Sequence, residues 1–320
     1  LGGIGIYISL VLVMSLSGVI LNAPSLLILT GCLTLLFFLG LKDDLLVLSP
    51  RKKLFGQLIA SFLFISITDI RVIGFSNIFS LEVMPYWASI AFTVFVFVLI
   101  INAYNLIDGI DGLAGTVALM VSFVFGLLFY QDTNVGSATL TVAMAGSLIA
   151  FLRLNISKKN KVFMGDTGSL IIGFMLAVFA VDFIYTAQTN PLSHYTGTAP
   201  IIVLAILFFP LIDTLRIFII RIFIYKTSPF SADKNHIHHR LLSLGYSHLQ
   251  STGIIVIVNA LIIAMAFNIQ QLEIHLQLLL VLGFGSLLFS LPFIKQVKFI
   301  PAFKLKRLRL RFLLFLNSFF

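Results

Sequence analysis

Five of the twelve acidic residues of this chain lie in short motifs beside long apolar runs, where an ionised side chain is costly and usually functional. The first motif places Asp43 directly before Asp44. Two adjacent carboxylates repel each other unless a cation or a proton lies between them. Charged residues also commonly mark the ends of membrane spans. The pair alone therefore leaves a ligand site and a solvated helix end both open.

A second motif spaces Asn105, Asp108 and Asp111 three residues apart. If this turn is helical, Asp108 and Asp111 lie on one face. Gly109 and Gly112 allow the backbone to approach a ligand closely. Carboxylates between apolar spans are costly, and a connecting loop needs none of them. The motif therefore predicts a polar binding site.

A third motif, residues 163–169, begins an apolar helix and contains Asp166. Asp, Thr and Ser are good N-cap residues, so Asp166 could simply cap this helix. The free N–H groups of a helix N-terminus also bind phosphate. Both interpretations can hold together.

The fourth motif contains His236, His238 and His239, followed by Arg240. Three histidines suggest zinc at first sight, but no Cys or Glu completes a ligand set and their spacing is not i, i+4. Arginine binds phosphate through paired hydrogen bonds. The motif therefore predicts an anion clamp rather than a zinc site.

Together the four motifs offer carboxylate and amide oxygens without thiolates, which is the ligand chemistry of Mg²⁺ or Mn²⁺. Histidine and arginine donors can then bind phosphate oxygens. Such a site in a lipid-facing protein indicates a phosphorylated lipid substrate.

The elements that position these motifs are apolar runs. Of the 320 residues 59% are hydrophobic and 10% are charged, whereas soluble domains average about 25% charged. Only helices and closed barrels satisfy the backbone in lipid, so we predict an all-α polytopic membrane protein. The expected spans are 4–21, 25–41, 54–69, 86–104, 113–130, 136–153, 168–187, 199–224, 252–268 and 276–294.

Lys and Arg residues are distributed unequally between the two ends of these spans. With Leu1 inside, the outer connections contain only Arg71, and the other twenty basic residues lie at the inner side. The positive-inside rule therefore places all four motifs on the cytoplasmic face. The net charge of +9 reflects topology, and nucleic-acid binding is excluded as its explanation. We expect one transmembrane catalytic domain over 1–294 and a basic cytoplasmic tail over 295–320.

In these motifs the chain resembles the polyprenyl-phosphate N-acetylhexosamine-1-phosphate transferases of glycosyl transferase family 4. The matching residues run from Leu1-Gly2-Gly3-Ile4 through the Asp and Asn motifs to the His-Ile-His-His-Arg sequence. The resemblance implies transfer of a sugar 1-phosphate from a UDP-sugar to polyprenyl phosphate, with release of UMP, in the bacterial inner membrane. The family fold has eleven spanning helices, so we expect one further helix before Leu1.

The resemblance also implies roles for individual residues. The expected metal ligands are Asp166 and Asn105. The expected catalytic residues are Asp43, Asp44 and Asp111. The expected substrate-binding residues are Lys53, Asn105, Asp108, Phe163, His236, His238, His239 and Arg240.

The histidine motif is similar to the WecA-type rather than the MraY-type enzymes, because Arg240 follows the histidines. This favours N-acetylglucosamine over a phospho-muramoyl-pentapeptide, and leaves other N-acetylhexosamines and a homodimer open. Direct attack by the lipid phosphate and a covalent phospho-aspartate intermediate also remain alternatives. An ion-coupled transporter is disfavoured, because transporters place charged groups near mid-span and often have repeated halves.

Overall fold

The computed structural model describes residues 2–21, 23–75, 78, 83–226 and 236–294. In these residues the secondary structure is helical and contains no strand, which confirms the all-α prediction. The expected tail, 295–320, lies outside the described residues. The helices are α1 (Gly2–Ile20), α2 (Pro24–Leu46), α3 (Pro50–Thr68), α4 (Tyr86–Ile107), α5 (Leu113–Gln131), α6 (Val135–Asn155), α7 (Gly165–Thr189), α8 (Ala199–Ile206), α9 (Phe208–Ile219), the π-helix η2 (Ile220–Tyr225), α10 (Ile237–Ser243), α11 (His248–Asn268) and α12 (Ile274–Ile294).

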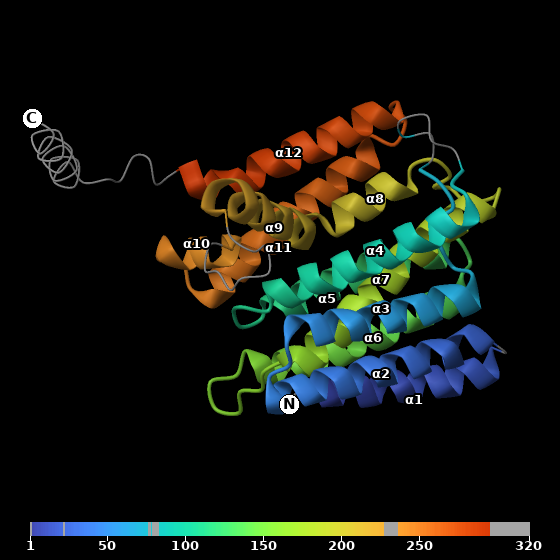
Figure 1. The fold of residues 1–320 in the computed structure, drawn as a ribbon. Helices are drawn as coiled ribbons and strands as arrows, with labels where there is room; N and C mark the ends of the chain where they lie inside the picture. Colours follow the sequence, from blue (N-terminus) through green and yellow to red (C-terminus); the bar gives the residue numbers. More distant parts are fainter. Residues whose placement is uncertain (1, 22, 76–77, 79–82, 227–235, 295–320) are drawn as a thin grey trace, which may run out of the picture.

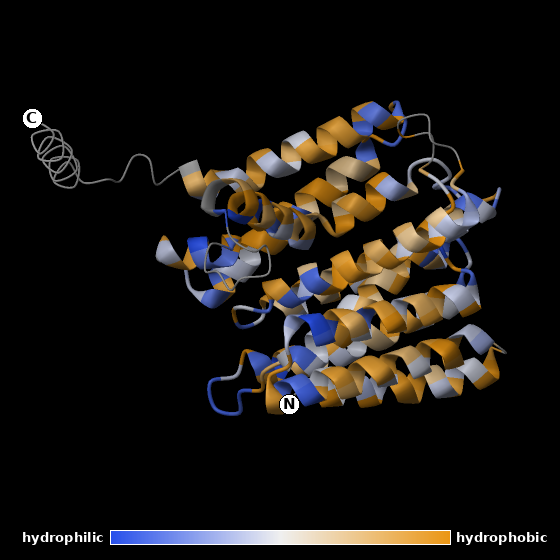
Figure 2. Cartoon of the chain, in the orientation of Figure 1, coloured by the Kyte–Doolittle hydropathy of each residue, from blue (hydrophilic) through white to orange (hydrophobic). Residues whose placement is uncertain are grey.

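The long helices run side by side as a bundle, with apolar middles and hydrophilic ends (Figures 1 and 2). Within the described residues, eight of them are long and apolar enough to cross a membrane, and α8 with α9 forms a ninth candidate. The remaining predicted span is α3, whose first turn carries Arg51, Lys52 and Lys53. It packs between α2 and α4 in the same bundle.

Helix α7 is the central element of the bundle. It is apolar on every side, and it is buried along almost its whole length. Its neighbours include α1, α2, α4 and α5. A helix that is hydrophobic all round belongs in the interior, so the α7 N-terminus is held by several other helices.

Glycine brings α2 against the start of α7. A Cβ atom at Gly40 would lie 2.5 Å from the Cα of Thr167, so a larger residue would push the two backbones apart. Asp44 follows Gly40 by four residues and therefore lies on the same face of α2. The close approach aims the Asp44 carboxylate at the first turn of α7.

The predicted span 199–224 is not a continuous helix but two helices bent by 75° at Leu207. Pro210 has no N–H, so it cannot donate to the carbonyl of Ile206, and a proline in a helix interior breaks or kinks the helix. Asn259 of α11 replaces the lost bonds. Its Nδ2 donates to the Ile206 carbonyl at 3.0 Å, and its Oδ1 accepts from the Phe209 N–H at 2.9 Å.

Asn259 is fully buried, and the bilayer interior offers no water to replace its bonds. We therefore expect Asn259→Leu to lower the thermal midpoint in detergent by several degrees. Each backbone group left unpaired costs about 1–3 kcal/mol. The matched control is Asn268→Leu on the same helix, where the exposed side chain bonds only the Ala264 carbonyl. Equal midpoints for the two variants would contradict this role of Asn259.

Candidate active site

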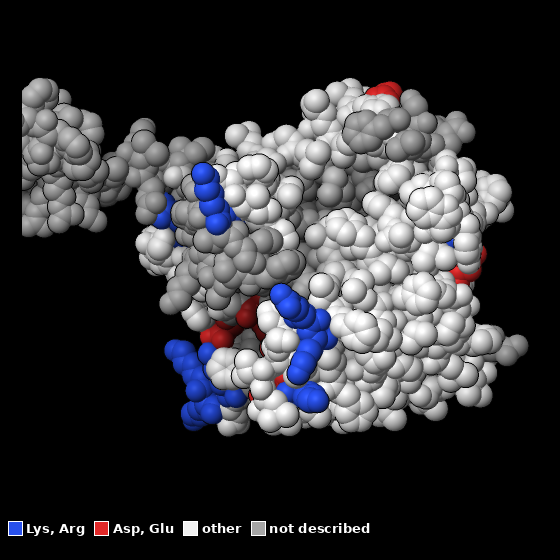
Figure 3. All heavy atoms as spheres, in the orientation of Figure 1, with Lys and Arg blue, Asp and Glu red and all other residues white. Residues whose placement is uncertain are grey.

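The predicted motifs meet at the end of the bundle that carries the N-terminus of the chain. Figure 3 shows Lys and Arg side chains gathered around acidic ones at this end. We use the name acidic cluster for Asp43, Asp44, Asp108 and Asp166, which come from α2, the end of α4 and the start of α7. Among the described residues, the acidic residues at the opposite end are isolated, such as Asp182, which accepts hydrogen bonds from Asn134 and Ser137.

Asp44 caps helix α7 from a neighbouring helix. Its Oδ1 accepts from the Asp166 N–H at 2.7 Å, and its Oδ2 accepts from the Thr167 N–H at 3.1 Å and from the Thr167 hydroxyl at 2.6 Å. The first N–H groups of a helix have no partner within the helix, and the helix dipole favours an anion there. The cap that the sequence allowed for Asp166 is therefore supplied by Asp44.

Lys53 bridges two carboxylates of the acidic cluster. Its Nζ contacts Asp43 and lies 3.3 Å from Asp166 Oδ2. The buried Asp43 also accepts from the Leu48 N–H at 2.6 Å. The resemblance implied that Lys53 binds substrate, which stays a prediction; in this structure its charge compensates two aspartates. Lys53 therefore supplies the local positive charge that the adjacent carboxylates require.

Asn105 lies beside Asp166, and the metal role predicted for both stays a prediction. Its Nδ2 donates to Asp166 Oδ1 and to the Ser169 hydroxyl, both at 2.7 Å. The amide oxygen of Asn105 therefore points away from Asp166. The side chain positions Asp166 through its nitrogen, and its oxygen keeps its capacity to accept or to coordinate.

Asp108 ends α4 next to the other carboxylates. Its side chain reaches solvent, but protein surrounds the carboxyl closely. Burial, together with the negative charges of Asp166, Asp111 and Asp44, raises the pKa of Asp108 to about 7. Carboxylates that raise one another's pKa mark a site that favours a bound cation.

Asp111 belongs to a different set of contacts. Its Oδ2 lies 2.7 Å from Lys161 Nζ and 2.9 Å from His248 Nδ1. Burial alone would raise the pKa of Asp111, but the bonds from Lys161 and His248 outweigh it and hold the pKa below its usual range. Asp111 thus joins the loop before α7 to the start of α11. Its predicted catalytic role stays a prediction.

Phe163 projects from the same loop. Its ring is 64% exposed, and Lys161 Nζ lies 5.0 Å from the ring centre. An exposed aromatic ring beside a cation at a polar site can stack on a base while the cation meets a phosphate. The ring is thus available for the substrate contact that the resemblance implied for Phe163.

The histidine motif is fixed by a residue to which the sequence assigned no role, Asp213 of α9. Its carboxylate lies 2.8 Å from His236 Nδ1. Next in the motif, His238 is buried, and its Nε2 would lie 2.3 Å from a Cβ atom at Gly109, so the motif contacts the loop that carries Asp108. Burial lowers the pKa of His238 to about 3, which makes the ring neutral at neutral pH. His239 packs against His238 with ring centres 4.3 Å apart.

Arg240 points toward α12 rather than into the acidic cluster. Its Nε donates to the Pro292 carbonyl, and its Nη1 donates to the Ser243 hydroxyl, both at 3.3 Å. The predicted phosphate contact would require this side chain to turn. It stays a prediction.

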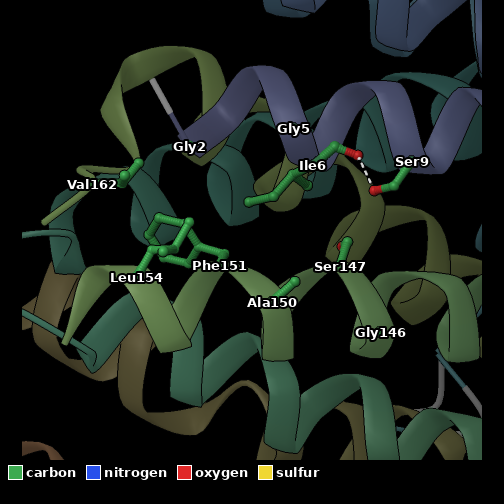
Figure 4. A pocket seen from close by; sticks show the side chains of 10 residues that line it. All are labelled: Gly2, Gly5, Ile6, Ser9, Gly146, Ser147, Ala150, Phe151, Leu154 and Val162. Atoms are coloured by element: carbon green, nitrogen blue, oxygen red, sulfur yellow. Dashed lines mark hydrogen bonds between the residues drawn. The ribbon is translucent and has the colours of Figure 1, made fainter. Parts of the chain in front are cut away.

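An apolar groove of about 470 Å³ opens between α1 and α6 at the same end (Figure 4). Small residues such as Gly5 and Ala150 line it, together with Phe151. Gly2 lies at its end and donates its N–H to the Phe163 carbonyl at 2.9 Å. The groove therefore ends at the loop that precedes Asp166.

Sequence reasoning missed Lys161, His248 and Asp213 as site residues. Fifty residues separate Lys161 from Asp111, and 137 separate His248 from it, so no local pattern reveals either pair. A signal for Asp213 did exist, because an acidic residue inside an apolar span is a functional hypothesis by default.

These features define a multi-pass membrane protein with a polar site at one end of its bundle. Comparison with known proteins gives the family. The profile described as glycosyl transferase family 4 matches residues 26–184. A probable undecaprenyl-phosphate N-acetylglucosaminyl 1-phosphate transferase of Bacillus subtilis (strain 168) is 31% identical over 283 residues, covering 88% of this chain and 76% of the relative. The chain therefore belongs to glycosyl transferase family 4, which confirms the resemblance seen in the sequence.

Two further relatives have related names. A decaprenyl-phosphate N-acetylglucosaminephosphotransferase of Mycobacterium leprae (strain TN) is 35% identical, over 66% of this chain and 56% of the relative. An undecaprenyl-phosphate alpha-N-acetylglucosaminyl 1-phosphate transferase of Escherichia coli (strain K12) is 28% identical, over 82% of this chain and 70% of the relative. The chain thus spans a little more than half the length of the first of these two proteins.

We expect Asp44→Asn to destabilise the protein, because an amide offers one acceptor oxygen where the helix start uses two. At least one donor of α7 then loses its partner, at a cost of about 1–3 kcal/mol. The measurement is the thermal midpoint in detergent.

The control for Asp44→Asn is Glu273→Gln. Glu273 is also an acid at a helix start and accepts from the His275 and Leu276 N–H groups, but it is exposed. Such a surface change stays within about 0.5 kcal/mol. An Asp44→Asn midpoint as high as that of the control would show that the inter-helix cap contributes nothing.

Proposed function

We propose that this chain transfers N-acetylglucosamine 1-phosphate from its UDP-sugar to a polyprenyl phosphate and releases UMP. The observation that carries the proposal is the acidic cluster at the basic end of a membrane bundle, organised around the start of α7. The names of the relatives support the same reaction and the same lipid class. A transporter is less well supported, because these acidic residues gather at one end of the bundle.

We also propose that this end faces the cytoplasm of a bacterial inner membrane. The connections at this end contain the basic residues, such as Arg153 and Lys159, whereas the described outer connections contain Arg71, which pairs with Asp69. Cytoplasmic loops carry the excess of Lys and Arg. Nucleotide-linked sugars are made in the cytoplasm, so this orientation suits a UDP-sugar donor.

The residues present fit a divalent cation of the Mg²⁺ type. Within the described residues, no three His, Cys, Asp or Glu side chains converge into a complete metal site. Mg²⁺ does not need one, because it is commonly bound by one or two carboxylates together with substrate phosphates and water. Asp166 would hold it, and Asn105 would add its amide oxygen after the amide group turned over, because its nitrogen faces Asp166 in this structure. When bound, the cation neutralises charge on the diphosphate.

The chemical step places several anions together, and the protein groups reduce their repulsion. A lipid phosphate oxygen forms a bond to the β-phosphorus of the UDP-sugar, and the bond from that phosphorus to the oxygen of UMP breaks. Lys53 and Lys161 stand beside the carboxylates and can move their charge onto phosphate oxygens as substrate enters. Asp44 holds the first turn of α7 in position for this step.

Direct attack is better supported than a phospho-aspartate intermediate. A phosphate monoester has a second pKa of about 6, so it is already mostly a dianion at neutral pH and needs little help from a base. Asp44 accepts three hydrogen bonds, and Asp43 is buried against Lys53. Neither carboxylate is oriented as a free nucleophile in this structure.

The proposed lipid and the proposed sugar are supported by separate observations. The apolar groove beside Phe163 supports a substrate with a long isoprenoid chain. N-acetylglucosamine is favoured by the relatives' names and by Arg240 after the histidines. The alternative donors are UDP-sugars that carry a muramoyl-pentapeptide or another N-acetylhexosamine.

The test of the proposed function is UMP release by purified protein, given polyprenyl phosphate, Mg²⁺ and a panel of UDP-sugars. We expect turnover with UDP-N-acetylglucosamine.

Asp166→Asn should lose on the order of a thousandfold in rate, because the amide keeps one oxygen and loses the charge that holds the cation. The fold should survive, since Asp44 supplies the helix cap.

The matched control is Asp69→Asn at the opposite end of the bundle. Asp69 has a left-handed backbone conformation, which asparagine tolerates. Its pair with Arg71 is at the surface and contributes at most about 1 kcal/mol. Wild-type turnover by Asp166→Asn would remove Asp166 from the site, and absence of turnover by the wild type with every UDP-sugar would contradict the function.

Metal removal gives a further expectation. Wild-type transfer should stop in excess EDTA and return when Mg²⁺ or Mn²⁺ is added in excess of the chelator. Zn²⁺ should restore little, because the proposed ligands are hard oxygens and include no thiolate or histidine. Full turnover in EDTA-treated, metal-free buffer would contradict the cation proposal.

A further inference from the structure

Asp213 is a buried acidic residue that the acidic cluster does not use. Its side chain is completely inaccessible to solvent. The Oδ2 atom lies 2.8 Å from His236 Nδ1, and Oδ1 accepts a hydrogen bond from the Ile237 N–H at 2.9 Å. Both carboxylate oxygens are therefore directed at the start of the histidine motif.

This contact assigns the ring proton of His236 when Asp213 is ionised. An ionised carboxylate only accepts hydrogen bonds, so the nitrogen that faces it, Nδ1, is then the protonated atom. The partner of one ring nitrogen thus sets the role of the other. Nε2, on the other side of the ring, then carries no proton and can only accept a hydrogen bond.

The histidine motif also connects His236 to the acidic cluster. The rings of His236 and His238 are stacked with centres 5.5 Å apart. His238 in turn packs against Gly109, which follows Asp108 directly. His236 is therefore one ring away from the loop that bears a carboxylate of the cluster.

We propose that Asp213 is a positioning residue of the transferase site, which holds His236 in its Nδ1-protonated form so that Nε2 is presented to the substrate as a hydrogen-bond acceptor for a hydroxyl or N–H group of the sugar. The inference rests on the proposed function for the identity of that substrate. The bend at Leu207 contributes, because α9 begins at Phe208 and its direction determines where Asp213 lies. Asn259 and Pro210 fix that bend, so the position of His236 is determined by α11 as well as by α9.

A simpler role for Asp213 would be to cap α10 through the Ile237 N–H. Asparagine caps a helix about as well as aspartate, so a capping role predicts that Asp213→Asn is tolerated. Positioning predicts a different result. If the Asn oxygen accepts from Ile237, its NH₂ group must face His236 Nδ1, and the ring proton then moves to Nε2.

The first measurement is independent of activity. In protein labelled with ¹⁵N-histidine and reconstituted in lipid, the His236 signals are assigned by their loss in His236→Gln. We expect a protonated Nδ1 in the wild type and an unprotonated Nδ1 in Asp213→Asn. An unprotonated Nδ1 in the wild type, or the same tautomer in both proteins, would overturn the inference.

The second measurement is a double-mutant cycle on transfer. Partners that orient a site residue through a hydrogen bond typically contribute about 10–100-fold, so we expect a loss of that size in kcat for Asp213→Asn. In a His236→Gln background the same change should cost nothing more, because Asp213 acts through His236. Additive losses, or full activity of Asp213→Asn, would contradict positioning.

The control is Asp132→Asn, a buried aspartate at the opposite end whose Oδ2 accepts from the Ser193 hydroxyl. It should keep wild-type kcat. If the wild type transfers no sugar phosphate at all, the proposed function fails, and the tautomer measurement still decides the role of Asp213.

Discussion

The site depends on one interaction, the capping of helix α7 by Asp44 from helix α2. A helix start buried in a membrane protein needs acceptors for its free N–H groups, and Asp44 provides two oxygens to Asp166 and Thr167. The same bonds fix the backbone of Asp166, so its side chain can face Lys53 and Asn105. Gly40 makes the contact possible by letting α2 approach α7.

Charge balance at the edge of the hydrocarbon explains the rest of the site. Each carboxylate there requires donors or a cation, because burying an isolated charge is very costly. Lys53 serves Asp43 and Asp166, while Lys161 serves Asp111. Burial first, and then the neighbouring carboxylates, raise the pKa of Asp108 to about 7, so a further negative charge is costly at this place. A site of this kind is suited to take up a cation together with a diphosphate.

Much of this could be predicted from the sequence. Hydropathy located the spans, because their length is set by the bilayer, and the Asp motifs marked the end at which the site lies. Pro210 is a local signal for the bend at Leu207, but the sequence does not show that Asn259 supports the bend. The partners of Asp44 and Asp213 could not be predicted for the same reason. Each is defined by contacts between helices far apart in sequence, such as Asp44 with Asp166, and local spacing carries no information about them.

The central claim is that a phosphorus atom moves together with the sugar from nucleotide to lipid. The most direct measurement uses UDP-N-acetylglucosamine labelled with ³²P at the β-phosphorus and with ³H in the sugar, together with polyprenyl phosphate and the purified chain. The account predicts that both labels enter the lipid product in equal amounts and that the released nucleotide is unlabelled UMP. Transfer of ³H to the lipid with ³²P retained in released UDP would contradict it.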